Sequence, residues 1–124
     1  MSTILIIEDD QILMKACETK LRQEGYEIIT ANDGDTGLRV ALDRKPDVIL
    51  LDILLPKRDG VSVLHELRNN ESYGKDALVV VLTNLSADDP ISKEIRALQP
   101  ADYLVKVEQT PDSIAQRVLK VLKK

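Results

Sequence analysis

The stretch "ILIIEDDQIL", residues 4–13, places four apolar residues directly before three adjacent carboxylates, Glu8, Asp9 and Asp10. A nearly continuous apolar run is typical of a strand whose two faces are both covered, as in a parallel sheet. Adjacent like charges repel one another, which raises their pKa values unless a cation compensates. The stretch therefore predicts a buried strand that ends at a charged site.

Other apolar runs in the chain are also too short for ordinary helices. Together with residues 3–7, they predict strands at 27–30, 47–51, 77–82 and 102–105. Between them, apolar residues recur at the spacing of amphipathic helices. The predicted helices contain Leu13, Cys17 and Leu21; Leu38 and Leu42; Val63, Leu64 and Leu67; Ile91, Ile95 and Leu98; and Ile114, Val118 and Leu122. This alternation predicts an α/β fold, (βα)5, with a doubly wound sheet.

Residues that commonly begin or end helices stand at the expected places. An acceptor side chain is expected just before the first turn, proline within it, and glycine or proline beyond the last turn. The chain offers, in order, Asp10, Gly25, Pro46, Asp89 with Pro90, and Thr110 with Pro111.

The composition limits the classes of protein to which the chain can belong. With 124 residues, 44% hydrophobic and 31% charged, we expect one domain over 1–124. No apolar run approaches the roughly 20 residues of a membrane span and the start lacks a secretory signal, so we expect a cytoplasmic protein without a membrane partner. One cysteine and one histidine do not supply a zinc cluster. A net charge of -4 and three aromatic residues, all Tyr, argue against direct nucleic-acid binding.

Residues capable of chemistry follow three further strands of the predicted sheet: Asp52, Thr83 and Lys106. Ligands of open α/β sheets bind outside the carboxyl ends of the strands, so we expect these residues to meet the first acidic group there. Taken singly, each is more commonly a helix cap, a turn residue or a solvated charge. Together, an oxygen-rich cluster suits Mg²⁺, and the hydroxyl and ammonium suit a phosphoryl group on or near Asp52.

At these positions the sequence resembles the receiver domain of bacterial two-component response regulators. The resemblance covers essentially the whole chain: the acidic pair after the first strand, "LLDILLPKRDG" (50–60), Thr83, and "ADYLVK" (101–106). Each motif alone is weak, but the ordered set is highly specific. It implies a flavodoxin-like fold with five parallel strands in the order 2-1-3-4-5.

The resemblance also implies a role for each site residue. Asp52 would be the phosphoacceptor, Asp9 a direct Mg²⁺ ligand, Glu8 a ligand through water, and the backbone carbonyl of Leu54 a further ligand. Thr83 and Lys106 would hold phosphoryl oxygens. Pro56 and Gly60 match the family's turn after the acceptor, where glycine tolerates backbone angles that other residues resist.

The phosphoryl group of such receivers comes from a phosphohistidine on a sensor kinase or phosphotransfer protein. By this resemblance the domain would assist its own phosphorylation and dephosphorylation, and we do not expect an enzyme with a separate substrate. Phosphorylation would draw Thr83 inward, Tyr103 would turn inward after it, and the face built from the fourth helix, fifth strand and fifth helix would change shape. That face, with Ile91, Ile95 and Leu98, would contact a downstream protein, an output domain or a second copy of the chain, although core packing explains this apolar spacing equally well.

Two residues depart from the family pattern. Val107 stands where proline usually follows the lysine, and because a cis bond before a non-proline residue costs about 2.5 to 4 kcal/mol, we predict a trans bond there. Asn84 stands where a small residue usually follows the threonine, and we predict that it shields the phosphoryl group and slows its hydrolysis.

The sequence disfavours three other functions and leaves a fourth open. His65 in "LHELRNN" (64–70) resembles a kinase histidine, but it lies in an α/β domain and not on a long dimerising helical hairpin. A phosphatase with an aspartate nucleophile requires a second acid two residues after Asp52, where this chain has Leu54. A flavin or nucleotide site requires a glycine-rich loop after the first strand, whereas residues 8–16 contain no glycine. A phosphorylation-independent scaffold stays open as the alternative.

Overall fold

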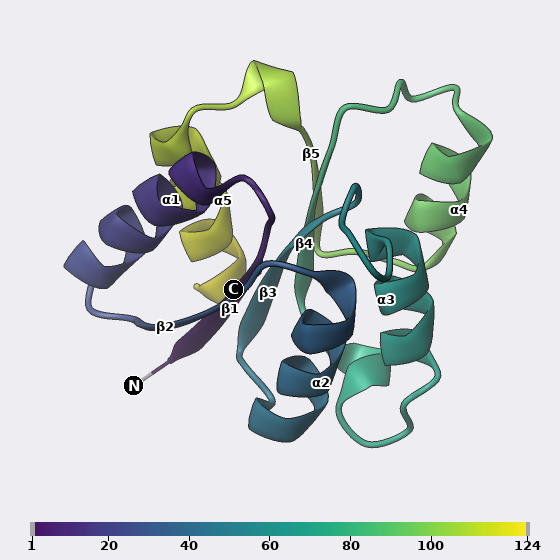
Figure 1. Ribbon diagram of the computed structural model, residues 1–124, viewed down its shortest axis with the longest axis horizontal. Helices are drawn as coiled ribbons and strands as arrows, with labels where there is room; N and C mark the ends of the chain where they lie inside the picture. The colour runs from purple at the N-terminus through teal and green to yellow at the C-terminus, as the bar shows by residue number, and fades with distance from the viewer. Residues whose placement is uncertain (1, 124) are drawn as a thin grey trace.

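The apolar runs form the strands of one parallel sheet. The computed structural model describes residues 2–123 and arranges five strands in the order β2-β1-β3-β4-β5, as expected (Figure 1). The strands are β1 (Thr3–Ile7), β2 (Glu27–Ala31), β3 (Val48–Asp52), β4 (Val79–Thr83) and β5 (Asp102–Val105). β3 and β4 start and end later than predicted, so Asp52 and Thr83 are the last residues of their strands. The reason for β3 is that Asp52 still pairs with Leu82 in the ladder.

Helices follow all five strands, and each α-helix begins at a side-chain cap. They are α1 (Gln11–Gln23), α2 (Gly34–Arg44), α3 (Gly60–Arg68), α4 (Pro90–Ala97) and α5 (Pro111–Leu122), with short 3₁₀ helices η1 (Gly74–Asp76) and η2 (Lys106–Glu108). The caps are Asp10, Asp33, Asp59, Asp89 and Thr110, which confirms the three that were predicted. None of the helices found between residues 2 and 123 combines the length and apolar character that a membrane crossing needs.

Both faces of the sheet are covered by helices, which explains the continuous apolar runs. Figure 1 shows α1 and α5 on one face and α2, α3 and α4 on the other. In β1, Ile4 and Ile6 pack beneath α1 and α5, whereas Leu5 and Ile7 pack beneath the other three helices. Full burial of such a side chain contributes roughly 1.5–3 kcal/mol to the stability of the fold, so apolar residues on either face of the strand are stabilising.

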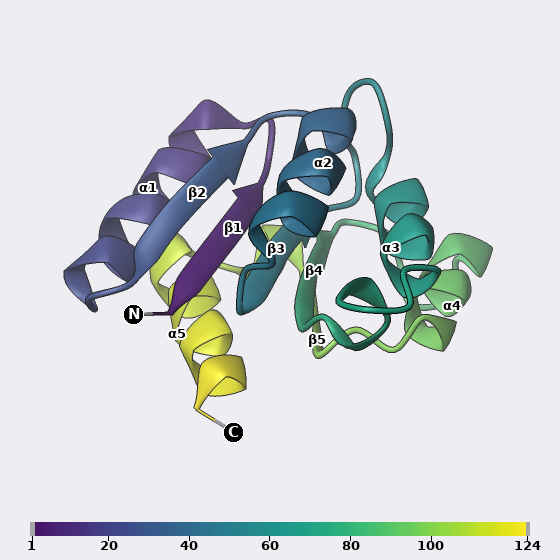
Figure 2. The same ribbon diagram turned by 90° about the horizontal axis from the view of Figure 1, so that it is seen from below.

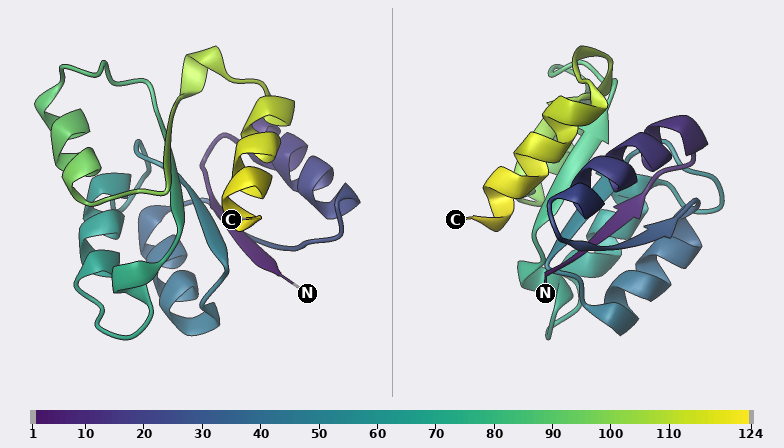
Figure 3. Two further views of the ribbon diagram at one scale, coloured as in Figure 1. Left: turned by 180° about the vertical axis from the view of Figure 1, so that it is seen from behind. Right: turned by 90° about the vertical axis from the view of Figure 1, so that its left-hand side faces the viewer.

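The common direction of the strands brings their carboxyl ends to one edge of the sheet. Figure 2 shows the arrowheads of β1 and β2 at the same end, and Ile7 is in register with Leu51 of β3. The loop between β4 and α4 and the 3₁₀ helix η2 after β5 also lie at this end (Figure 3, left). Residues that end or follow separate strands therefore meet here.

Gly60 shows why a glycine follows the turn after Asp52. The expected reason, an unusual backbone angle, is wrong, because the glycine with positive φ between residues 2 and 123 is Gly25, at 93°. The cause is a close approach: a Cβ on Gly60 would lie 2.4 Å from the carbonyl oxygen of Asp52. The start of α3 can therefore pack directly against the end of β3.

Candidate functional site

A buried carboxylate at the end of β3 is held by a lysine that follows β5. Nζ of Lys106 lies 2.9 Å from Oδ2 of Asp52 and 3.0 Å from Oε1 of Glu8. Asp52 and Glu8 are 3% and 1% exposed. A buried charge is costly unless it is paired, so the ammonium offsets charge that the fold forces together.

Asp9 adds a third carboxylate to this group. One oxygen from each of Glu8, Asp9 and Asp52 lies within 4.8 Å of the others, and Asp9 is exposed. We call these three residues and Lys106 the acidic pocket. Three carboxylates and one ammonium leave a formal charge of -2, which one divalent cation would cancel.

The uncompensated charge falls mainly on Glu8. Burial, and then the neighbouring Asp52, raise the pKa of Glu8 to about 7. Its Oε2 accepts from the backbone N–H of Asp10 at 3.0 Å and from Nζ of Lys106 at 3.2 Å. Its buried Oε1 lies 3.0 Å from the same ammonium but has no well-directed hydrogen-bond donor among the described residues. Burial alone would lower the pKa of Lys106, but its contacts with Asp52 and Glu8 outweigh burial and raise it. At neutral pH the lysine is therefore charged, and Glu8 shares it with Asp52.

The donor atoms of the acidic pocket fit a hard divalent ion. All of them are oxygens, and Mg²⁺ typically takes one or two protein carboxylates and keeps several waters. An ion or its bound water would also give Oε1 of Glu8 a well-directed partner in addition to its ion pair with Lys106. Asp10 is not part of this set, because its Oδ1 caps α1 by accepting from the N–H groups of Ile12 and Leu13.

Two backbone hydrogen bonds connect the site to residues two positions further along the chain. The N–H of Leu54 donates to Oδ1 of Asp52 at 3.3 Å, and the N–H of Leu85 donates to Oγ1 of Thr83 at 3.0 Å. Thr83 is buried at the end of β4, the neighbour of β3. Its hydroxyl accepts this bond and still has its own proton to donate.

Asn84 and Val107, the two unusual residues, are bonded to each other. The backbone N–H of Val107 donates to Oδ1 of Asn84 at 2.9 Å. The predicted trans bond between Lys106 and Val107 is confirmed, since residues 2–123 contain no cis peptide. Proline has no N–H to donate, so the Asn84 amide suits valine at 107. Sequence reasoning treated the two departures separately and missed their pairing.

Tyr103 of β5 packs against α4. Its hydroxyl donates to Oγ of Ser92 at 2.8 Å, and Ser92, which is completely buried, donates to the carbonyl oxygen of Ser86 at 2.7 Å. The guanidinium of Arg96 covers the ring, 4.4 Å from its centroid. Sequence reasoning missed Ser92, because a serine within a helix carries no distinctive signal.

The apolar surface expected on α4 is smaller than predicted. Ile95 is completely buried in the core beneath α2, α3 and α4, and Leu98 is half-buried against it. Ile91, by contrast, is 42% exposed. Helical spacing marks all three as apolar but does not show which of them the sheet covers.

His65, the histidine set aside above, lies in α3 and pairs with α4. Its Nε2 is 2.6 Å from Oε2 of Glu94, and both side chains are about half exposed. This pair joins two neighbouring helices, and it lies outside the acidic pocket.

The pattern of the chain matches a known family. A family model described as the response regulator receiver domain matches residues 4–119. The chain belongs to this family. It is therefore a receiver domain of two-component systems, a signalling domain with an acidic pocket and not a conventional enzyme.

Relatives of this receiver include regulators of transcription. It is 36% identical over 121 residues to the probable transcriptional regulatory protein TcrX of Mycobacterium tuberculosis. The matched region covers 96% of this chain and 47% of TcrX. It is 32% identical over 123 residues to the alkaline phosphatase synthesis transcriptional regulatory protein PhoP of Bacillus subtilis, covering 98% and 48%. The receiver thus spans about half the length of these relatives.

Solved structures of receiver domains share the fold. The receiver domain of sensor histidine kinase PA1611 from Pseudomonas aeruginosa has a TM-score of 0.84 at 27% identity, covering 99% of this chain and 98% of that one, and carries a magnesium ion in its active site cleft. The BeF3-activated receiver domain of Klebsiella pneumoniae RstA has a TM-score of 0.81 at 26% identity, covering 99% and 100%.

Proposed function

We propose that this receiver accepts a phosphoryl group on Asp52 from a phosphohistidine of a sensor kinase or phosphotransfer protein. Mg²⁺ would be held by Asp9 and Asp52, by Glu8 through water, and by the carbonyl of Leu54. The observation that carries the proposal is the 2.9 Å contact between Nζ of Lys106 and buried Oδ2 of Asp52, beside two further carboxylates. The magnesium ion in the PA1611 receiver supports the choice of metal.

The chemistry at Asp52 is a displacement at phosphorus. The bond from phosphorus to the histidine nitrogen breaks, a bond to a carboxylate oxygen of Asp52 forms, and the departing imidazole takes up a proton. Bound Mg²⁺ would supply charge stabilisation for the transferred oxygens. The ammonium of Lys106 would exchange its contact with Oδ2 of Asp52 for a contact with a phosphoryl oxygen, and Thr83 would donate its hydroxyl proton to another phosphoryl oxygen.

The new phosphoryl group would then act on Tyr103 and its surroundings. It adds negative charge and three acceptor oxygens, to one of which Thr83 would donate its hydroxyl proton, and turning of that hydroxyl would disturb the bond it accepts from the N–H of Leu85. When Thr83 turns toward the phosphoryl group, Tyr103 and α4 would respond, and the face of α4, β5 and α5 would change. A downstream protein, an output domain or a second copy of the chain would read that face.

Apolar side chains around the acidic pocket support docking of a partner that carries the phosphohistidine. Ile12, Leu54 and Val107 are 85%, 72% and 76% exposed, and each stands within three positions of Asp9, Asp52 or Lys106. Exposed apolar groups near one site are typical of a contact surface. A docked partner would also exclude water from the reacting atoms.

Among the contacts of residues 2–123, none favours a phosphorylation-independent scaffold. Asn84 and Val107, the departures that raised this alternative, bond to each other and leave Lys106 at Asp52. Absence of nucleic-acid binding by residues 1–124 stays a prediction, since the named transcriptional regulators are about twice as long.

Intact mass spectrometry after incubation with acetyl phosphate and Mg²⁺ tests the proposed function. We expect a labile gain of about 80 Da that EDTA prevents and Asp52→Asn abolishes. Asp59→Asn is the control, because Asp59 caps α3 outside the acidic pocket. An adduct that persists in Asp52→Asn, or no adduct at all, would overturn the proposal.

A further inference from the structure

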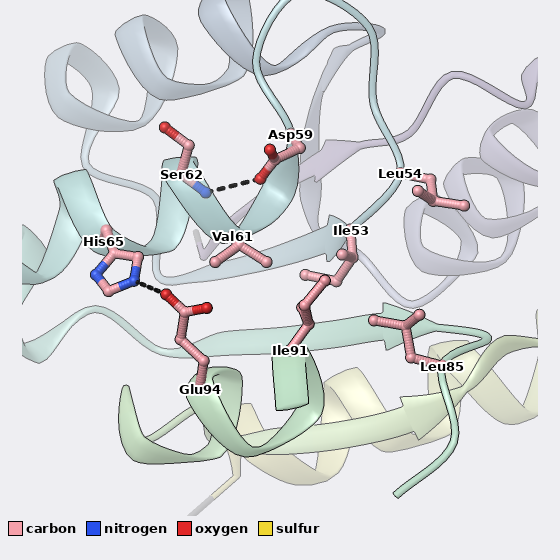
Figure 4. Close-up of a pocket in the computed structure, with 9 residues that line it drawn as sticks. All are labelled: Ile53, Leu54, Asp59, Val61, Ser62, His65, Leu85, Ile91 and Glu94. Carbon is pink, nitrogen blue, oxygen red and sulfur yellow. Dashed lines mark hydrogen bonds and ion pairs between the residues drawn. The ribbon is translucent and has the colours of Figure 1, made fainter. Parts of the chain in front are cut away.

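A second concave site lies between α3 and α4, beside the acidic pocket. We call it the α3–α4 groove and define its apolar lining as Ile53, Leu54, Val61, Leu85 and Ile91. Its volume is about 470 Å³, within the range of protein ligand sites. Figure 4 shows Ile91 reaching from α4 toward Val61 of α3 and Ile53, with Leu54 and Leu85 at one end.

The groove carries two carboxylates, Asp59 and Glu94, beside the polar side chains of Ser62 and His65. Asp59 stands at the start of α3, and the Glu94–His65 pair closes the end away from Leu54 and Leu85 (Figure 4). Each carboxylate has one engaged oxygen: Oδ1 of Asp59 accepts from the N–H of Ser62, and Oε2 of Glu94 contacts His65. Among the described residues, no lysine or arginine lines the groove. A fitting occupant must therefore bring both an apolar side chain and a positive charge.

We propose that the α3–α4 groove binds a short segment of a partner protein in which an apolar side chain adjoins a lysine or arginine. The apolar side chain would cover Ile91, Val61 and Ile53, and the cation would meet the free oxygens of Asp59 or Glu94. Apolar anchors seated in a concave patch with charges at its rim are the usual source of affinity in such contacts. The groove lies between α3 and α4, so Ile91, which was expected on the face of α4, β5 and α5, lines this groove.

The groove is joined to the acidic pocket through two of its lining residues. The N–H of Leu54 donates to Asp52 and the N–H of Leu85 donates to Thr83. A phosphoryl group on Asp52 that engages Thr83 would disturb these bonds and shift one end of the groove. Occupancy of the groove and phosphorylation should then oppose each other, and such coupling is reciprocal. This coupling, unlike the groove itself, rests on the proposed function.

Binding can be tested with two synthetic 12-residue amphipathic helical peptides, identical except that one carries lysine and the other glutamate on its polar face. We expect amide NMR shifts at Ile53, Val61, Leu85 and Ile91 with the lysine peptide, and none with the glutamate peptide. Ile91→Asp and Glu94→Lys should each weaken binding about tenfold. Leu78→Asp is the matched control, because Leu78 is 41% exposed against 42% for Ile91 but lies outside the groove.

Three outcomes would overturn the binding site: no binding of the lysine peptide, equal binding of both peptides, or equal loss in Leu78→Asp. Self-association that Ile91→Asp abolishes would also overturn it, since the occupant would be a second copy.

Beryllofluoride with Mg²⁺, a mimic of the phosphoryl group, tests the coupling. We expect it to weaken the lysine peptide about fivefold or more, and Thr83→Ala to remove that difference. Unchanged affinity would overturn the coupling. Failure of the proposed function would show separately, as a missing acetyl phosphate adduct in a protein that still binds the peptide.

Discussion

Lys106 and Asp52 are 54 positions apart in the chain, yet Nζ of the lysine lies 2.9 Å from Oδ2 of the aspartate. Asp52 ends β3 and Lys106 directly follows β5, and β4 lies between these two strands. The lysine side chain therefore extends across the end of β4 to reach the carboxylate. The same ammonium also contacts Glu8. Two buried carboxylates therefore share one ammonium, so the acidic pocket keeps a net negative charge that a divalent ion would neutralise.

Replacing Lys106 should strengthen metal binding. Without its ammonium, Lys106→Met leaves the three carboxylates uncompensated, so we expect Mg²⁺ to bind about fivefold more tightly, as removal of a nearby charge worth on the order of 1 kcal/mol implies. Isothermal titration calorimetry measures this, with Lys93→Met on α4 as the control. Weaker Mg²⁺ binding in Lys106→Met would contradict the proposed charge balance.

Glu8 should make the metal-free protein less stable as the pH rises. Its pKa is raised from 4.5 to about 7, so the folded state favours the protonated form, and stability is lost as the pH rises from 4.5 through 7. Glu8→Gln mimics the protonated form. In EDTA it should raise the free energy of unfolding by about 2 kcal/mol at pH 8 and change it little at pH 4.

Urea unfolding at both pH values checks this, with exposed Glu66→Gln as the control. Equal pH profiles for Glu8→Gln and the parent protein would exclude Glu8 as the source of the loss.

Ser92 should fix the position of Tyr103. Ser92→Ala removes the acceptor of the Tyr103 hydroxyl, so we expect a loss of about 1 kcal/mol in unfolding free energy and a more mobile ring. Ring NMR signals of labelled tyrosine report the motion. Ser86→Ala keeps the carbonyl that Ser92 uses and serves as the control. An unchanged Tyr103 signal in Ser92→Ala would show that ring packing alone holds it.

Asn84 should protect a phosphoryl group on Asp52. Its side-chain oxygen accepts from the N–H of Val107, the residue after Lys106, and Asn84→Ala would remove both the side chain and that bond. We expect the adduct formed with acetyl phosphate to decay a few-fold faster, as loss of about 1 kcal/mol of shielding implies. Val107→Ala keeps the N–H and should decay like the parent protein. No acceleration in Asn84→Ala would refute the shielding role.

Arg68 should be a major source of stability outside the site. Its guanidinium donates to the carbonyl oxygens of Gly74, Ala77, Leu98 and Gln99, which ties α3 to η1 and to the end of α4. Arg68→Met should lower the free energy of unfolding by about 3 kcal/mol, since several bonds to a charged donor are lost together. Arg39→Met, at an exposed position of α2, should stay within about 0.5 kcal/mol.

The strands and the caps at Asp10, Asp89 and Thr110 could be predicted, because they depend on local periodicity and on residue types with strong positional preferences, whereas the strand order was implied by the resemblance to receiver domains. The meeting of Asp52 with Lys106 could be expected, because parallel strands bring their carboxyl ends to one edge. The hydrogen-bond partner of Tyr103 could not be predicted, because the bond from its hydroxyl to Ser92 depends on how α4 packs against β5. The reason for Gly60 was missed in the same way, since a close approach between segments leaves no local pattern.

Locating the phosphoryl group tests the proposed chemistry most directly. After treatment with acetyl phosphate and Mg²⁺, borohydride reduces an aspartyl phosphate to homoserine, and peptide mass mapping then identifies the modified position. We expect homoserine at position 52 alone, and none when EDTA replaces Mg²⁺. Homoserine at Asp9 or Asp59, or no modification of Asp52 with Mg²⁺ present, would contradict a phosphoacceptor held by Lys106 in the acidic pocket.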